Sequence, residues 1–445
     1  MTFENKELAI LDRALSKLKS GFNDFPDTLT TDNEDAIERI LHKIAIKMHD
    51  NYPYPSNNYA GQMLKPPHAI ARLAYSLALY INPNNHALDG SRASSPMEKS
   101  CVQRIAAMMG WSESLGHLTS GGTMANLEAL WIAGKIHPDK KVVASEFAHY
   151  THRRITEVLN IEYQEIPADN DGRMCMLHLI TTLKTGTVGT VVVTLGTTGM
   201  GMVDALEDII ALKKQFNFRI HIDAAYGGYF KIAKKLSPYV SRQFAVVHEA
   251  DSIVIDPHKH GLQPYGCGCI LFKDTSVGQY YLHDSPYTYF SSKELHLGEI
   301  SLECSRAGAA AVALWATMEL YPLLTDGEFA NQLDACLQAA IDLQNLITYD
   351  NRFITIIRPD LDIVVWGIKA DSLSEMTRRA QAFFKKAAEQ NLHLALIKIP
   401  ANRLPNHWNK IEHDQEYVTC LRSCLMKPTH KKFIDEMWRI IQRII

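Results

Sequence analysis

Short apolar runs alternate with stretches of helical periodicity through the middle of this chain of 445 residues. The apolar runs that are typical of buried strands occupy residues 141–145, 187–196, 218–223 and 251–256. Apolar strands that are joined by helices form parallel sheets covered on both faces. From about residue 98, the pattern therefore predicts an open, doubly wound α/β sheet.

The segments on either side of this sheet have different patterns. Helical periodicity predicts two amphipathic helices within the first 50 residues, and four prolines in residues 51–67 predict an extended segment. After residue 320, a mixture of helical and strand patterns indicates a smaller α+β unit. We therefore expect three parts: an N-terminal arm of residues 1–85, a large domain of residues 86–320 and a small domain of residues 321–445.

Composition argues against several classes of protein. Lys plus Arg number 46 and Asp plus Glu 49, so the net charge of −3 lacks the basic excess of nucleic-acid binders. The first residues lack the layout of a secretory signal, and no apolar run approaches the roughly 18 residues of a membrane span. The eight cysteines form no C-x-x-C pair, which argues against a zinc site. We expect a cytoplasmic protein without a metal, nucleic-acid or membrane partner.

Polar residues follow three of the expected strands, at the edge where open α/β sheets bind ligands. Gly122 and Thr123 stand between the strand HLTS and a helix that begins near Met124. Free backbone N–H groups at such a helix start can cradle an anion. An ordinary strand-to-helix turn is the alternative. Because G-x-G-x-x-G is absent, a single phosphate fits better than a dinucleotide.

The other two strand ends carry charged residues. Asp223 precedes small residues that leave room for a flat ring, although an ordinary turn-forming aspartate is the alternative. Lys259 follows a buried strand, where desolvation would make its amine a nucleophile that forms Schiff bases. A solvent-exposed lysine is the alternative there.

The three strand ends together are far less expected by chance than any one of them. Pyridoxal 5'-phosphate needs a phosphate anchor, a carboxylate at its pyridine nitrogen and a lysine that binds its aldehyde. The order of cradle, Asp223 and Lys259 supplies all three. The sequence therefore predicts a pyridoxal phosphate site.

The segments TSGGTMANLEAL, HIDAAYGG and DPHKHG resemble the group II pyridoxal phosphate-dependent amino acid decarboxylases, which include the glutamate, aromatic amino acid, tyrosine and histidine enzymes. The resemblance extends from about residue 50 to the end of the chain. It implies the type I fold of the aspartate aminotransferase-like enzymes. It also implies conversion of an L-amino acid to its amine and CO2, and a homodimer with its site at the subunit interface.

The resemblance assigns cofactor contacts to individual residues. Lys259 corresponds to the lysine that binds the cofactor, Asp223 to the carboxylate at the ring nitrogen, and His149 to the histidine stacked on the ring. Further cofactor contacts are implied for Gly122, Thr123, Thr197, Ala225 and His258. Arg306 corresponds to an arginine that reaches the phosphate of the neighbouring subunit's cofactor; a surface arginine is the alternative.

The resemblance also implies residues that act on the substrate. Arg422 corresponds to the arginine that holds the substrate α-carboxylate, unless it pairs with a nearby acid. Tyr287 and Tyr289 lie in a stretch that resembles a mobile catalytic loop, and we favour Tyr289 as the donor of the proton to the carbanion. His149 is an alternative donor.

The choice of substrate stays open at the level of the sequence. One candidate wall contains Tyr59 and Gln62, which suits an aromatic substrate, and another contains His86 and Arg92, of which Arg92 suits an acidic one. Each of these residues could equally belong to a subunit interface. We favour an aromatic substrate. A carbon–carbon lyase of the sphingoid-phosphate lyase type and an aldehyde-forming oxidative decarboxylase are the alternatives.

Overall fold

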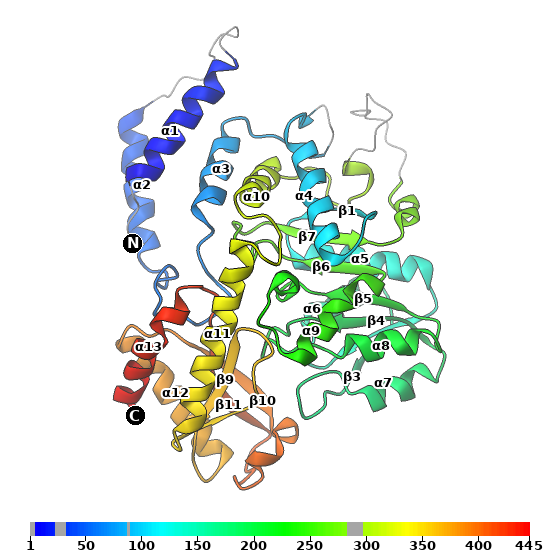
Figure 1. Cartoon of the computed structure of the whole chain (residues 1–445), viewed down its shortest axis with the longest axis vertical. Coiled ribbons are helices and arrows are strands. Elements are labelled where there is room, and N and C mark those ends of the chain that lie inside the picture. Colours follow the sequence, from blue (N-terminus) through cyan, green and yellow to red (C-terminus); the bar gives the residue numbers. More distant parts are fainter. Residues whose placement is uncertain (1–4, 23–32, 87–89, 283–296) are drawn as a thin grey trace.

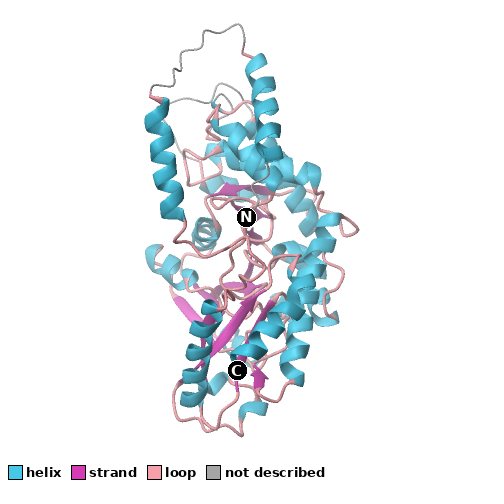
Figure 2. Cartoon of the chain, turned by 90° about the vertical axis from the view of Figure 1, so that its left-hand side faces the viewer, coloured by secondary structure: helices cyan, strands magenta, loops and turns pink. Residues whose placement is uncertain are grey.

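The computed structural model describes residues 5–22, 33–86, 90–282 and 297–445, whose arrangement is shown in Figure 1. Two separate sheets organise these residues. The larger sheet has seven strands between residues 115 and 272, and the smaller has four between residues 353 and 424. Figure 2 shows the strands towards the middle of the molecule, with helices around them.

The larger sheet is mostly parallel, as the sequence predicts. Its strands are β1 (Leu115–Thr119), β2 (Lys141–Ser145), β3 (Tyr163–Ile166), β4 (Val188–Thr194), β5 (Arg219–Asp223), β6 (Ser252–Ile255) and β7 (Gly268–Phe272). They lie in the order β1–β7–β6–β5–β4–β2–β3. Only β7 runs against its neighbours, β1 and β6. The sequence prediction omits β7, which begins among glycines and cysteines rather than in a long apolar run.

Both faces of the larger sheet are buried. Val191 and Val193 of β4 face one apolar core, while Val192 between them faces another. The first core includes α4 (Ser94–Met109), α7 (Met176–Leu183), α8 (Leu206–Lys213) and α9 (Pro238–Ala245). The second includes α5 (Gly122–Ile136) and α6 (Thr151–Val158). Because side chains alternate along a strand, a layer of helices covers each face.

The smaller sheet is antiparallel throughout. Its order is β10–β11–β9–β8. The strands are β8 (Phe353–Thr355), β9 (Ile363–Ile368), β10 (Ala395–Pro400) and β11 (Tyr417–Cys424). The helices α11 (Glu328–Tyr349), α12 (Leu373–Glu389) and α13 (His430–Ile444) pack on it around the buried Trp366. This confirms the predicted change to α+β structure in the last part of the chain.

The N-terminal region contains the two predicted helices, α1 (Asn5–Ser20) and α2 (Glu34–Met48), followed by α3 (Ala69–Leu79). Residues 51–67 contain no helix, as their prolines predict. Figure 1 shows α1 and α2 at one side of the molecule, and α10 (Gly308–Leu320) packs against α3. The domain boundaries predicted at residues 85 and 320 stay predictions. No helix in the described ranges has the length and apolarity that a membrane span needs.

Buried polar contacts join the two sheets. Asp362, next to the start of β9, accepts a hydrogen bond of 2.6 Å from the hydroxyl of Tyr226 and lies 3.2 Å from Nε2 of His260. All three residues are buried. Burial alone would raise the pKa of Asp362, but His260 and the Tyr226 hydroxyl outweigh it and lower that pKa. The smaller sheet is therefore held against the loops that follow β5 and β6.

Candidate active site

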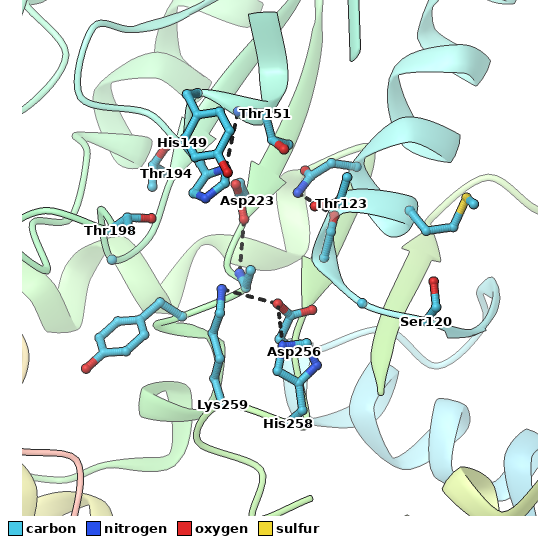
Figure 3. A pocket seen from close by; sticks show the side chains of 18 residues that line it. Ser120, Thr123, His149, Thr151, Thr194, Thr198, Asp223, Asp256, His258 and Lys259 are labelled. Atoms are coloured by element: carbon cyan, nitrogen blue, oxygen red, sulfur yellow. Dashed lines mark hydrogen bonds and ion pairs between the residues drawn. The ribbon is translucent and has the colours of Figure 1, made fainter. Parts of the chain in front are cut away.

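A cavity of about 400 Å³ lies at the carboxyl ends of the parallel strands. Its walls come from the last residues of β4 and β5 and from the loops that follow β1, β2 and β6. Figure 3 shows the side chains that line it. Ligands of open α/β sheets bind at this edge. The three strand ends that the sequence singles out therefore meet around one cavity.

Asp223 provides a buried anion at the end of β5. Its Oδ2 atom lies 2.9 Å from Nε2 of His152, and its Oδ1 atom accepts the N–H of Ala225 at 3.1 Å. Burial alone would raise the pKa of Asp223. The hydrogen bond from His152, the positive charge of Lys259 and the N–H of Ala225 outweigh burial and hold that pKa well below its usual range. Asp223 is therefore ionised at neutral pH.

Lys259 reaches into the same cavity from the loop after β6 (Figure 3). Its Nζ atom lies 3.2 Å from Oδ2 of Asp256, and its side chain is 20% exposed. The amine is thus close to a carboxylate partner and still accessible from the cavity. A lysine in this position can form a bond to an aldehyde that enters the cavity.

The loop between β1 and α5 forms an anion cradle. The first turn of an α-helix leaves its backbone N–H groups without partners within the helix, and α5 begins at Gly122 on the cavity wall. His258 also lines the cavity, and its Nδ1 atom donates to the carbonyl of Cys267 at 2.8 Å, which fixes the ring. A Cβ atom at Gly122 would lie only 2.7 Å from Oδ2 of Asp256, so a larger residue there would have to displace the buried Asp256 carboxylate.

His149 forms a further part of the cavity wall, in the turn before α6. Its Nδ1 atom accepts the N–H of Thr151 at 3.2 Å, and its ring stacks on Tyr150 with the centroids 4.4 Å apart. Burial lowers the pKa of His149, more than the nearby Asp223 raises it. The imidazole is therefore mostly neutral at pH 7.

The family model described as the pyridoxal-dependent decarboxylase conserved domain matches residues 133–369, which is more than half of the chain. The chain belongs to this family. The decarboxylase is accordingly a carboxy-lyase, and its cofactor is pyridoxal 5'-phosphate. The family predicted from the three motifs is confirmed.

Several curated decarboxylases are similar to the chain. The L-tyrosine decarboxylase of Enterococcus faecium is 27% identical over 461 residues, covering 79% of this chain and 75% of the relative. The L-tyrosine/L-aspartate decarboxylase of Methanocaldococcus jannaschii is 27% identical over 340 residues, covering 73% and 82%. The L-aspartate decarboxylase of Thermococcus kodakarensis is 27% identical over 287 residues, covering 63% and 72%.

Solved structures confirm the predicted type I fold. Mouse CSAD has a TM-score of 0.79 at 18% identity, and the alignment covers 96% of this chain and 92% of that one. Oryza sativa TDC, solved with PLP and tryptamine, has a TM-score of 0.80 at 15% identity and covers 100% and 98%. At these identities the similarity establishes the fold only.

The residues around the cavity fit pyridoxal phosphate. In Figure 3 the side chains of Asp223, Lys259 and Thr123 lie around the same cavity. Pyridoxal phosphate carries its aldehyde opposite the ring nitrogen and its phosphate arm on the carbon next to the aldehyde, so a carboxylate, an amine and an anion cradle around one cavity match its three groups. Oγ1 of Thr194 and Oδ1 of Asp256 are buried and have no hydrogen-bond partner among the described residues. Asp256 adds a negative charge near the cradle, which the amine of Lys259 at 3.2 Å offsets.

The structure also brings two predicted substrate residues to the cavity edge. Arg422 of β11 donates from NH2 to the carbonyl of Thr198 at 2.8 Å and from NH1 to Oε1 of Gln62 at 3.2 Å. Thr198 lines the cavity, and Nε of the buried Arg422 has no hydrogen-bond partner among the described residues. Tyr59 is buried and does not line the cavity. Its hydroxyl accepts the N–H of Gln62 at 3.1 Å.

Other predicted residues lie away from this cavity. The hydroxyl of Thr197 accepts the N–H of Met202 within a turn, so its neighbours Thr194 and Thr198 line the cavity instead. Arg306 is bound to Glu98 at 2.6 Å, because its guanidinium points into a buried polar cluster rather than into the cavity. That contact lies within one chain, whereas the sequence prediction gave Arg306 a contact to the neighbouring subunit.

The remaining predictions concern the wall and the catalytic loop. Arg92 is exposed, and neither it nor His86 lines the cavity. The carbonyl of His86 accepts the N–H of Gly298 at 2.8 Å. Tyr287 and Tyr289 lie outside the described residues.

Four polar residues near the cavity were missed by the sequence analysis: Asn126, His152, His221 and Asp256. Two signals in the sequence point to His221 and His152. His221 precedes Asp223 by two positions, and such residues share one face of a strand. His152 follows His149 by three positions at a helix start. Neither signal identifies a partner, since each contact joins residues far apart in the chain.

His221 links β5 to the cradle. Its Nε2 atom donates to Oδ1 of Asn126 at 2.8 Å, and its Nδ1 atom accepts from the hydroxyl of Ser252 at 2.8 Å. Asn126 in turn donates to the carbonyl of Gly122 at 2.8 Å. Burial is the main cause that lowers the pKa of His221 from 6.5 to about 3. The ring is therefore neutral in the folded chain.

Stability should fall with pH below the ordinary pKa of histidine. Between pH 6.5 and about 3 the unfolded His221 takes up a proton that the folded residue does not. The free energy of unfolding should therefore fall by about 1.4 kcal/mol per pH unit from this residue. In denaturant titrations from pH 7 to pH 5, His221→Gln should show a shallower dependence. The exposed His413→Gln is the control, and equal slopes for His221→Gln and the unmodified chain would contradict the assignment.

Proposed function

We propose that this decarboxylase acts on an aromatic L-amino acid, with tyrosine as the first substrate to test. The observation that carries the proposal is the small number of basic side chains around the cavity. The basic side chains among its described lining residues are Lys259, His149 and His258, and each is assigned to the cofactor. Arg422 at the edge is assigned to the α-carboxylate. No described cation at the cavity is left over for an acidic side chain, whereas Tyr226 offers an aromatic wall.

The names of the relatives support an aromatic substrate but leave an acidic competitor. L-tyrosine is the substrate named for the Enterococcus faecium enzyme, and L-tyrosine and L-aspartate are both named for the Methanocaldococcus jannaschii enzyme. Arg92 was the predicted partner for an acidic substrate. Its exposed position outside the cavity weakens that alternative.

Each part of the cofactor has a partner among the cavity residues. The N–H groups at Gly122 and Thr123, together with His258, would hold the phosphate. Asp223 would pair with the protonated ring nitrogen, His149 would cover the ring face, Ala225 would pack against it, and Lys259 would bind the aldehyde. When bound, pyridoxal phosphate supplies an electron sink for the bond between Cα and the carboxylate.

The other residues orient the substrate and move its protons. The planar guanidinium of Arg422 can bind the substrate α-carboxylate through two parallel hydrogen bonds. Arg422 is close enough to the cavity for this role, because it lies beside Thr198, which lines the cavity. Gln62 supports that arginine through its amide oxygen. The proton that replaces the carboxylate at Cα would come from Tyr289, with Tyr287 and His149 as the alternative donors.

Removal of Lys259 should abolish the covalent form of the bound cofactor. Purified chain loaded with pyridoxal phosphate should absorb near ~420 nm, and Lys259→Ala should lose this band. Asp223→Ala should keep the band and lose roughly 100-fold or more in kcat, because the buried anion opposite the ring nitrogen is gone. The control is Lys214→Ala, an exposed lysine at the end of α8. A 420 nm band that survives in Lys259→Ala would refute the assignment.

A panel of the twenty amino acids should identify the substrate class. CO2 and amine released from tyrosine should exceed those from aspartate and glutamate by at least about tenfold in kcat/KM, a difference of about 1.4 kcal/mol. Arg422→Lys should raise KM for the preferred substrate, because lysine lacks the planar fork.

Three other results would contradict this proposal, two from the panel and one from a separate assay with a phosphorylated amine. A preference for aspartate would favour the acidic alternative. Hydrogen peroxide and aldehyde without amine would indicate the oxidative variant. Cleavage of a phosphorylated amine would indicate a carbon–carbon lyase.

We infer that the working form is a homodimer. The helix α2 has no buried residue, and its exposed apolar side chains include Ile37, Ile40, Leu41 and Ile44. Leu8 of α1 is 66% exposed as well. Exposed apolar faces of this extent are typical of subunit interfaces. A second copy of the chain is the partner that the family resemblance implies.

The mass in solution tests the dimer. Light scattering should give twice the mass of one chain, and Ile40→Asp with Leu41→Asp should shift the population towards the monomer by burying charge at the interface. The control is Val158→Asp with Leu177→Asp, two exposed apolar residues outside α1 and α2. This double variant should leave the mass in solution unchanged. A monomeric unmodified chain at micromolar concentration would contradict the inference.

A further inference from the structure

His152 makes a direct side-chain contact with Asp223 that the sequence motifs do not include. It lies in the first turn of α6, is fully buried, and places Nε2 2.9 Å from Oδ2 of Asp223. The other carboxylate oxygen, Oδ1, accepts the N–H of Ala225 at 3.1 Å. Each oxygen therefore has one fixed donor, and the two contacts together set the plane of the carboxylate.

The position of the proton in this contact follows from the partners. An ionised carboxylate only accepts hydrogen bonds, so the hydrogen between the two side chains belongs to Nε2 of His152. Nδ1 of His152 is buried and has no hydrogen-bond partner among the described residues. Nε2 is therefore the donor in this contact, and it is the ring nitrogen through which His152 holds the carboxylate.

The other groups near Asp223 cannot replace His152. The charged or titratable neighbours are Lys259, His149 and His221. Lys259 is assigned to the cofactor aldehyde, His221 is occupied by Asn126 and Ser252, and His149 lies against the ring position. Among the described side chains, His152 is the one hydrogen-bonded to Asp223.

We propose that His152 is a positioning residue that aims the Asp223 carboxylate at the pyridine nitrogen of the cofactor and so keeps the proton on that nitrogen. The proposal rests on the proposed role of Asp223. Without His152 the buried carboxylate would keep the Ala225 N–H alone, and the effect of burial, which raises the pKa of Asp223, would be less opposed. A carboxyl group that is protonated or rotated away cannot hold a proton on the ring.

The protonation of the ring nitrogen can be measured directly. The chain is loaded with pyridoxal phosphate that carries ¹⁵N in the ring, and the ¹⁵N chemical shift distinguishes protonated from bare nitrogen. In His152→Phe the signal should move towards the bare form by at least half of the change seen in Asp223→Ala. In His152→Gln, whose amide N–H₂ ends at the position of Nε2, the signal should stay close to that of the unmodified chain.

Activity provides a second readout. His152→Phe should lose about 10- to 100-fold in kcat, as residues that orient a ligand-binding side chain typically do. Its KM should change less than threefold, and His152→Gln should recover most of the loss. Thr156→Val is the matched control, because Thr156 lies buried on the same helix and bonds only to backbone carbonyls among the described residues.

A second variant covers the case in which His152→Phe does not fold, as judged by thermal unfolding. In His152→Asn the amide ends at the Nδ1 position and cannot reach Asp223, so the ¹⁵N signal should move as in the phenylalanine variant. An unchanged signal in a folded His152 variant, while Asp223→Ala shifts it, would overturn the inference and leave the proposed function intact. An unchanged signal in Asp223→Ala would overturn the assignment of Asp223 itself.

Discussion

All seven residues of β4 are buried, and parallel strands lie on both sides of it, so each connection between these strands must cross the sheet and add a helix to one of its faces. This constraint brings the carboxyl ends of β4, β5 and β6 to a single edge. The side chains that follow these strands then have no apolar layer above them. The cavity arises where the covering helices end and the loops begin.

The chemistry of that cavity depends on charges that are kept out of water. Asp223 and Asp256 are both buried carboxylates, and a buried charge is tolerated only where polar partners replace its water. Asp223 has His152 and the N–H of Ala225, while Asp256 has the amine of Lys259. The partners differ in kind. Asp223 is held by groups that stay in place, whereas Asp256 is held by an amine that a cofactor aldehyde would engage.

The smaller sheet completes the site from outside the sheet edge. Arg422 extends from β11 to the carbonyl of Thr198, and Asp362 binds both Tyr226 and His260. His260 directly follows Lys259 in the chain, so this buried contact helps to fix the loop that carries the lysine. Arg422 at the cavity edge and the loop that carries Lys259 are thereby positioned by contacts between the two sheets.

The sequence alone determined the parts that local patterns encode. Apolar runs and helical periodicity predicted the parallel strands. Asp223 at the end of β5 and Lys259 in the loop after β6 meet in one cavity as predicted, because parallel strands end at a common edge. The pairing of side chains was decided only by the tertiary structure. His152 and Asp223 are 71 positions apart, and Arg422 and Gln62 are 360 apart. Such contacts depend on how helices and sheets pack and on which rotamers the packing allows. For the same reason, the sequence pattern could not predict that the hydroxyl of Thr197 bonds to the N–H of Met202 and not to a ligand in the cavity.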